Sequence, residues 1–288
     1  MKSVPQFQTL LSLGRVSNLP TLWSNCLAGW WLGGGGNDGK LPFLFSGISL
    51  LFTGGAFLND AFDAEFDRRH RPERPVPAGH ISLAVVWRLG LGQLVAGIFL
   101  LIFCGQLAAG AAILLALSIL LYNFSHKFFT AAPWILGGCR FWVYIIAGAT
   151  GTFGLNGWPI YCGTALALYV AGQSQMARRE NFRFALPHWP LLLLAAPVVL
   201  AMAMNFGTAR TTALWLAILQ VSWVIYSMRT LFWGREVNGK HLVMDLIAGM
   251  VLVDWLAVGP MIPHWTGILL FPLLFGMTKW LQKFAPTG

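Results

Sequence analysis

The chain reads LNDAFDAEFDRRHRPERPVPAG from Leu58 to Gly79. This short segment holds half of the ten acidic residues in the 288-residue chain. On a helix, which turns by about 100° per residue, four oxygen-bearing side chains fall within one arc of about 100°, here called the acidic face: Asn59, Asp60, Asp63 and Asp67. Glu65 falls on the opposite side of the helix. Carboxylates this close repel one another unless a cation lies among them, and Mg²⁺ is a hard cation that prefers oxygen ligands. The alternative interpretation is a solvated charged loop with helix-capping acids.

The composition indicates an integral membrane protein. Hydrophobic residues make up 57% of the chain and charged residues 10%, and the mean hydropathy is +0.65, whereas about 25% of the residues in soluble domains are charged. Apolar runs approach the bilayer-spanning length of about 20 residues in ten places: Leu19–Gly33, Phe43–Phe62, Leu83–Cys104, Leu107–Tyr122, Trp134–Thr152, Pro159–Met176, Trp189–Met204, Thr212–Tyr226, His241–Val258 and Trp265–Leu281. We expect an all-α, polytopic transmembrane bundle of nine or ten helices, with residues 1–288 forming one domain.

The positions of the Lys and Arg residues along the chain indicate how the protein is oriented in the membrane. If the N-terminus is cytoplasmic, all Lys and Arg residues except Lys40, Arg140 and Arg210 belong to the cytoplasmic side, as the positive-inside rule expects. We therefore predict a multi-pass protein of the bacterial cytoplasmic membrane with its charged motifs facing the cytoplasm. The net charge of +9 is explained by this orientation and by anion binding, and no segment is typical of a nucleic-acid-binding module.

Two further groups of polar residues, on either side of the acidic face in the sequence, are candidate binding residues. Arg15 and Asn18 lie just before the first span, where they either line the cytoplasmic mouth of a cavity or anchor the helix at the interface. The arginines that follow the acidic face can bind phosphate oxygens or lipid headgroups: Arg68, Arg69, Arg71 and Arg74. A metal-bound diphosphate is a ligand that satisfies both the carboxylates and the arginines.

The run NDAFDAEFD, with the spacing NDxxDxxxD, and the following RPVPAG, Arg74–Gly79, resemble the first aspartate-rich motif of the UbiA family of intramembrane prenyltransferases, which includes 4-hydroxybenzoate polyprenyltransferase. The resemblance extends from Arg15 to about Glu180, and the last hundred residues match only in hydropathy. It implies a helix bundle around a central cavity open toward the cytoplasm and lipid. It also implies Mg²⁺, a prenyl diphosphate donor and an aromatic or other small acceptor.

The next cytoplasmic connection, YNFSHKFFTAAP, Tyr122–Pro133, is similar to the second cytoplasmic connection of that family. Lys127 would hold the diphosphate by this resemblance, although it can also be a topological anchor, and Phe128 stands where the family often has Arg. His126 is interpreted as a surface histidine, and Arg140 as a cavity residue because an unpaired buried arginine is costly.

The chain departs from the family after the sixth predicted span, in GQSQMARRENFRF, Gly172–Phe184. Members usually carry DxxxD there, but here Glu180 takes the first acidic position and Phe184 the second. Glu180 would be the opposing metal ligand, or a helix-end acid paired with neighbouring arginines. Further along, Asp254 lies deep in a predicted span, so we expect it to face the interior and to bind Ser, Asn or Arg there.

The reaction implied by the resemblance is Mg²⁺-dependent prenyl transfer with release of diphosphate. Asp63, Asp67 and Lys127 would be catalytic, and the metal would be held by Asn59, Asp60, Asp63, Asp67 and Glu180. Arg71, Arg74 and Lys127 would bind the diphosphate, and Arg15 and Asn18 the substrate. Two alternatives remain open: a catalytically weakened protein that binds polyprenyl lipids, and a transporter of an anionic solute.

Overall fold

The computed structural model describes residues 6–177, 189–229 and 239–284. Within these ranges the chain forms eleven α-helices and no strands, which confirms the all-α expectation. The helices are α1 (Gln6–Leu13), α2 (Leu19–Leu32), α3 (Leu41–His70), α4 (Leu83–Ile102), α5 (Gln106–Ser125), α6 (Ala132–Thr150), α7 (Gly157–Ala177), α8 (Trp189–Met204), α9 (Gly207–Ser227), α11 (Gly239–Val258) and α12 (His264–Phe284).

The ten apolar runs of the sequence coincide with the helices from α2 onward, and α1 is a short additional helix. Among the described residues, five helical segments are long and apolar enough to cross a membrane: 38–70, 83–102, 106–125, 132–150 and 241–258. Large apolar side chains on the outer helix faces are more than half exposed, including Val95 on α4, Leu192 on α8 and Trp215 on α9. Exposure of so many large apolar side chains is unfavourable in water and suits lipid. The chain is a multi-pass integral membrane protein.

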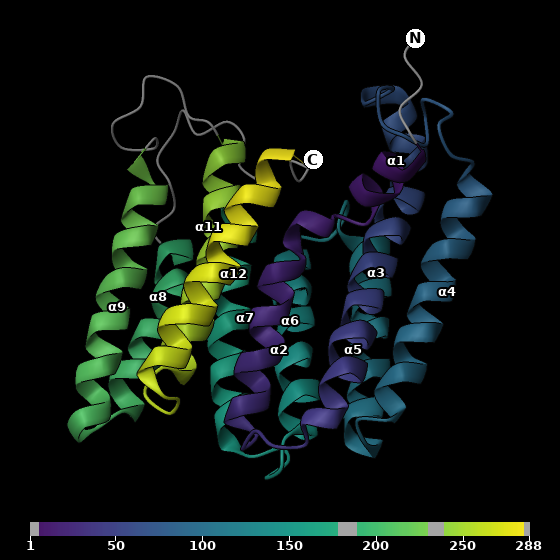
Figure 1. The fold of residues 1–288 in the computed structure, drawn as a ribbon. Coiled ribbons are helices and arrows are strands. Elements are labelled where there is room, and N and C mark those ends of the chain that lie inside the picture. Colours follow the sequence, from purple (N-terminus) through teal and green to yellow (C-terminus); the bar gives the residue numbers. More distant parts are fainter. Residues whose placement is uncertain (1–5, 178–188, 230–238, 285–288) are drawn as a thin grey trace.

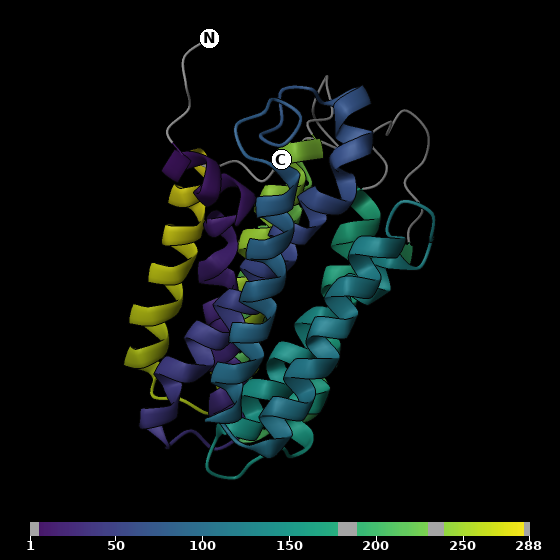
Figure 2. The same ribbon diagram turned by 90° about the vertical axis from the view of Figure 1, so that its right-hand side faces the viewer.

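The long helices run side by side along a common direction, and α2 lies near the middle of the bundle (Figure 1). Two hydrophobic cores meet at α2. One joins α2 with α3, α4, α5 and α6, and the other joins α2 with α7, α8, α11 and α12. The last turns of α3, the loop that follows it and α1 lie at the same end of the bundle (Figure 2). The acidic face is therefore presented at one end of a membrane-embedded bundle.

Glycines let α3 and α4 approach closely. A Cβ placed on Gly97 of α4 would lie 2.8 Å from the carbonyl oxygen of Gly47 on α3, and one on Gly54 would lie 2.9 Å from that of Gly90. Real Cβ atoms are not found this near to backbone oxygens. Small residues at such crossings are typical of helix packing in membranes, where close backbone approach replaces the hydrophobic driving force. This packing fixes the lateral position of α3, which carries the acidic face.

Replacement of Gly97 by Val is expected to separate α3 from α4 and to destabilise the protein by about 1–3 kcal/mol, as overpacking does elsewhere. Gly92→Val is the matched control, because Gly92 lies on the same helix, a Cβ added to it would have no other atom within 4 Å, and the change in helix propensity is the same. Thermal unfolding in detergent measures both. Equal stabilities for the two variants would contradict the close packing.

Candidate active site

The acidic face forms because α3 continues without a break from its apolar half to His70. Arg71 leaves the helical conformation at φ −143° and ψ 61°, because the following Pro72 disfavours the α conformation at this residue. Asp67 is 2% exposed and Asp60 9% exposed, whereas Glu65 is exposed and pairs with Arg68 and Arg69 on the other side. The arrangement confirms the predicted orientation of Glu65 away from the remaining carboxylates.

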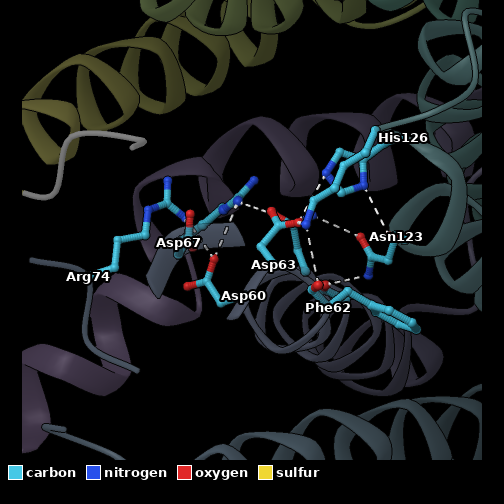
Figure 3. Close-up of polar contacts among 11 residues, drawn as sticks. Asp60, Phe62, Asp63, Asp67, Arg74, Asn123 and His126 are labelled. Atoms are coloured by element: carbon cyan, nitrogen blue, oxygen red, sulfur yellow. Dashed lines mark hydrogen bonds and ion pairs between the residues drawn. The ribbon is translucent and has the colours of Figure 1, made fainter. Parts of the chain in front are cut away.

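The loop after α3 brings Arg74 back onto the acidic face (Figure 3). Arg74 Nη1 lies 3.1 Å from Asp60 Oδ1 and 3.5 Å from Asp67 Oδ2. The loop is folded by backbone hydrogen bonds, among them one of 2.8 Å from the Ala78 N–H to the Arg74 carbonyl. A nearly buried carboxylate such as that of Asp67 is stable only when it is paired. Arg74 provides that charge for two carboxylates at once.

Arg15 reaches the same face from the connection between α1 and α2. Its Nη2 donates to Asn59 Oδ1 at 2.5 Å and lies 3.9 Å from Asp60 Oδ1. The Arg15 backbone is left-handed, with φ 47° and ψ 43°, a conformation that costs a non-glycine residue roughly 1–2 kcal/mol. The contacts with α3 offset this cost. They place Arg15 at the predicted mouth of the site.

Asp63 has a separate set of partners, supplied by the connection between α5 and α6. Lys127 Nζ lies 2.6 Å from Asp63 Oδ1, and His126 Nε2 lies 3.4 Å from the same oxygen. The prediction that His126 is a surface histidine is wrong, because its side chain is 18% exposed and faces Asp63. Figure 3 shows Asp63 turned toward His126, and Asp60 and Asp67 toward Arg74. The three carboxylates are therefore held in two groups.

Asn123 is a site residue that the sequence reasoning missed. Its Oδ1 accepts a 3.2 Å hydrogen bond from Asn59 Nδ2, and its own Nδ2 donates to the Gly55 carbonyl at 2.9 Å. Its position three and four residues before His126 and Lys127 was the available signal, since residues at that spacing share a helix face. Asn123 joins the α5 side of the site to α3.

A cavity of ≈ 210 Å³ extends from this face into the bundle, lined by residues of α2, α3, α5, α6, α7 and α11. Arg15, Asn59 and Asn123 line its polar end, and the rest of the wall is largely apolar. Asn18 and Arg140 also line it, which agrees with the predicted cavity positions of both. The structure therefore joins the charged face to a largely apolar chamber inside the bundle, the type of cavity in which small molecules bind.

Two predicted ligands are not part of this arrangement. The Arg71 side chain is exposed at the end of α3, and among the described residues it forms no ion pair with the acidic face. Glu180 lies outside the described residues, as does Phe184. The prediction that Glu180 is a metal ligand opposite the acidic face therefore rests on the sequence alone.

The oxygen atoms of the acidic face could supply part, but not all, of the coordination shell of Mg²⁺. In the described part of the chain, no group of three His, Cys, Asp or Glu side chains is close enough to hold a metal ion. Mg²⁺ commonly uses one or two carboxylates and completes its shell with water and substrate phosphates. Asp63 or Asp67, with the Asn59 and Asp60 oxygens nearby, fits that mode better than a cage made of protein ligands alone.

Arg74→Gln is expected to release the loop after α3, because the uncharged amide no longer neutralises Asp60 and Asp67. Backbone amides of residues 74–80 should then exchange with deuterium faster than in the unaltered protein. Arg68→Gln is the matched control, since among the residues that the structure describes Arg68 pairs only with the exposed Glu65. Unchanged exchange in Arg74→Gln would show that these contacts do not hold the loop.

Known proteins resemble this chain in sequence. The digeranylgeranylglyceryl phosphate synthase of Methanothrix thermoacetophila is 30% identical over 148 residues, which are 45% of this chain and 54% of that protein. The chain thus spans about half the length of this curated relative, and as little as 26% of another synthase, from Metallosphaera sedula.

Solved structures share the fold. A structure from a study of digeranylgeranylglyceryl phosphate synthase in membranes has a TM-score of 0.65 at 23% identity, covering 90% of this chain and 99% of its own. A UbiA homologue from Archaeoglobus fulgidus bound to GPP and Mg²⁺ has a TM-score of 0.50 at 13% identity, covering 96% of this chain and 99% of its own. Residues 18–181 match the model of the UbiA prenyltransferase family, close to the extent predicted from the motifs. The chain belongs to the UbiA prenyltransferase family.

Proposed function

We propose that this protein transfers an isoprenyl group from a prenyl diphosphate to an aromatic or other small acceptor within the membrane, in a Mg²⁺-dependent reaction. The observation that carries the proposal is the junction of the α3 carboxylates, the cations beside them and an apolar cavity at one end of a lipid-facing bundle. Family membership and the GPP and Mg²⁺ bound to the Archaeoglobus fulgidus homologue support it.

Residue roles follow from the charges. Asp63 and Asp67, with Asn59, Asp60 and Glu180, would hold the metal, which stabilises negative charge on the departing diphosphate. In the free protein, Lys127 neutralises Asp63 and Arg74 neutralises Asp60. When the prenyl diphosphate binds, both cations would turn to the diphosphate oxygens. Arg71, exposed beside them, would add a third cation, and Arg15 and Asn18 would line the substrate entrance.

The bond changes balance without a further reactant. The carbon–oxygen bond of the prenyl diphosphate breaks, and its electron pair leaves with the diphosphate. The acceptor forms the new bond to the prenyl carbon and then loses a proton. Because the cavity wall is largely apolar, water is kept from the allylic cation and the acceptor captures it.

The placement in the cell is part of the same proposal. The acidic end of the bundle would face the cytoplasm of a bacterial cell, since that orientation puts nearly all Lys and Arg residues on the inner side. The cavity would open toward this side and toward lipid, where the prenyl tail lies. Residues 1–288 would act as one domain.

Purified protein in lipid nanodiscs is expected to convert labelled prenyl diphosphates in the presence of Mg²⁺ and a panel of aromatic acceptors, and to stop when EDTA is added. The assay also separates the alternatives. Binding without conversion would indicate a polyprenyl-lipid-binding protein, and failure of every donor to bind or react would overturn the proposed activity in favour of another class, such as a transporter.

Asp63→Ala and Asp67→Ala are expected to lower Mg²⁺-dependent turnover by about 100-fold or more, the scale of losing a group that stabilises developing charge. Glu65→Ala, which removes an exposed carboxylate from the opposite side of α3, is the matched control and should leave turnover unchanged. Glu180→Ala should weaken turnover less than either aspartate variant. Full activity in Asp63→Ala would refute the assigned metal-binding face.

A further inference from the structure

A second polar cluster lies deeper in the bundle, away from the carboxylates of α3. Asp254 of α11 is fully buried and accepts hydrogen bonds from Ser24 Oγ at 2.5 Å, Asn25 Nδ2 at 2.6 Å and Tyr144 OH at 2.6 Å. The predicted interior position of Asp254 and its Ser and Asn partners are thereby confirmed. Both of its carboxylate oxygens are engaged, and Asp254 does not line the cavity.

Arg140 of α6 belongs to this cluster but does line the cavity. Its Nη1 donates to Asn25 Oδ1 at 2.6 Å and its Nη2 to Thr21 Oγ1 at 3.3 Å. Asn25 therefore bridges the arginine and the Asp254 carboxylate. A guanidinium has five N–H donors, so these two hydrogen bonds leave donors for a ligand on the cavity side.

The cavity also contains buried acceptor atoms that lack a donor. Asn18 is 8% exposed and Gln173 7% exposed, and within the described residues Asn18 Oδ1 and Gln173 Oε1 have no hydrogen-bond partner. Both residues line the same cavity as Arg140. Buried polar atoms are normally paired, so these oxygens suit a hydroxyl group of a bound molecule.

The position of Arg140 separates it from the mouth of the site. Its guanidinium carbon lies 5.7 Å from the ring centroid of Phe52, which precedes Asn59 by seven residues, or about 10 Å along α3. Arg15 is bonded to Asn59 at the mouth. The cavity thus has one arginine at its entrance and another deeper inside, and no carboxylate among its described lining residues.

We propose that Arg140 is a specificity-determining residue that binds an oxyanion of the acceptor, a carboxylate or a phosphate, inside the cavity, and that Asp254 positions its guanidinium through Asn25. The inference rests on the proposed function, because it takes the inner cavity as the acceptor site. The donor diphosphate binds at the mouth, and the acceptor lies between it and Arg140.

The experiment compares matched pairs of probes that differ in charge: 4-hydroxybenzoate with its methyl ester, and an alkylglycerol phosphate with the uncharged alkylglycerol. Binding to the full chain in detergent is measured by calorimetry without donor or Mg²⁺. In at least one pair the anion should bind about 10- to 100-fold more tightly than its neutral partner, the range for charge-assisted hydrogen bonds. The pair that shows the difference distinguishes a carboxylate from a phosphate.

Arg140→Gln is expected to bring that affinity ratio close to one, and Arg140→Lys to leave an intermediate ratio because it keeps the charge without the planar donor fork. Arg88→Gln, which removes an exposed arginine of α4, should retain the original ratio. Equal binding of both members of each pair to the unaltered protein would overturn the inference, as would an unchanged ratio in Arg140→Gln. The first of these outcomes requires no variant to fold.

The positioning role of Asp254 is tested by a double-mutant cycle. Asp254→Asn should reduce the affinity ratio in the unaltered background and have no further effect on it in Arg140→Gln. An equal loss of neutral and anionic binding would indicate a structural role only and would remove Asp254 from the proposal. These measurements need no turnover, so anion selectivity without prenyl transfer would refute the proposed function and leave the binding site standing.

Discussion

Three carboxylates on the last turns of α3 repel one another, and the partial negative charge of a helix C-terminus adds to the repulsion. The structure balances them with cations from elsewhere in the chain. Arg15 comes from the start of the chain, Arg74 from the loop after α3 and Lys127 from the connection between α5 and α6. Because the segments that carry Arg15 and Lys127 are distant from the acidic face in sequence, charge balance at one helix end joins them to α3 and its loop.

The same ion pairs explain how one site could serve both a metal and a diphosphate. In the free protein Lys127 neutralises Asp63, and Arg74 neutralises Asp67. If Mg²⁺ took the place of these cations beside the carboxylates, the cations would be released to pair with the oxygens of a diphosphate. The exchange keeps charges paired at every stage, which matters in surroundings of low dielectric constant where an unpaired charge is expensive. Arg74 contacts two carboxylates, so its movement would open both together.

The two charged residues of the deeper polar cluster differ in which of their atoms remain available to a ligand. Asp254 is enclosed by Ser24, Asn25 and Tyr144, so its charge acts as a fixed counter-charge inside the bundle. Arg140, one amide away, lines the cavity and uses two of its five N–H donors for Asn25 and Thr21. Burial of a compensating carboxylate behind a cation lets that cation remain in an apolar wall without a direct ion pair.

Much of the fold and part of the site could be predicted from the sequence, because hydropathy and helical periodicity are local properties. The apolar runs, the continuity of α3 into its acidic half and the separation of Glu65 from Asp60, Asp63 and Asp67 all follow from residue order alone. The family motif extended the prediction to Lys127. Glu180 stays a prediction, since it lies outside the described residues.

Only the tertiary structure decided which side chains contact one another between helices. Arg15 meets Asn59 across 44 residues, Asn59 meets Asn123 across 64 and Arg140 meets Asn25 across 115. The inward orientation of His126 and the role of Asn123 belong to the same class of facts. Local sequence determines which face of a helix is polar, whereas the choice of the opposing side chain depends on how distant helices pack, and no local pattern encodes that.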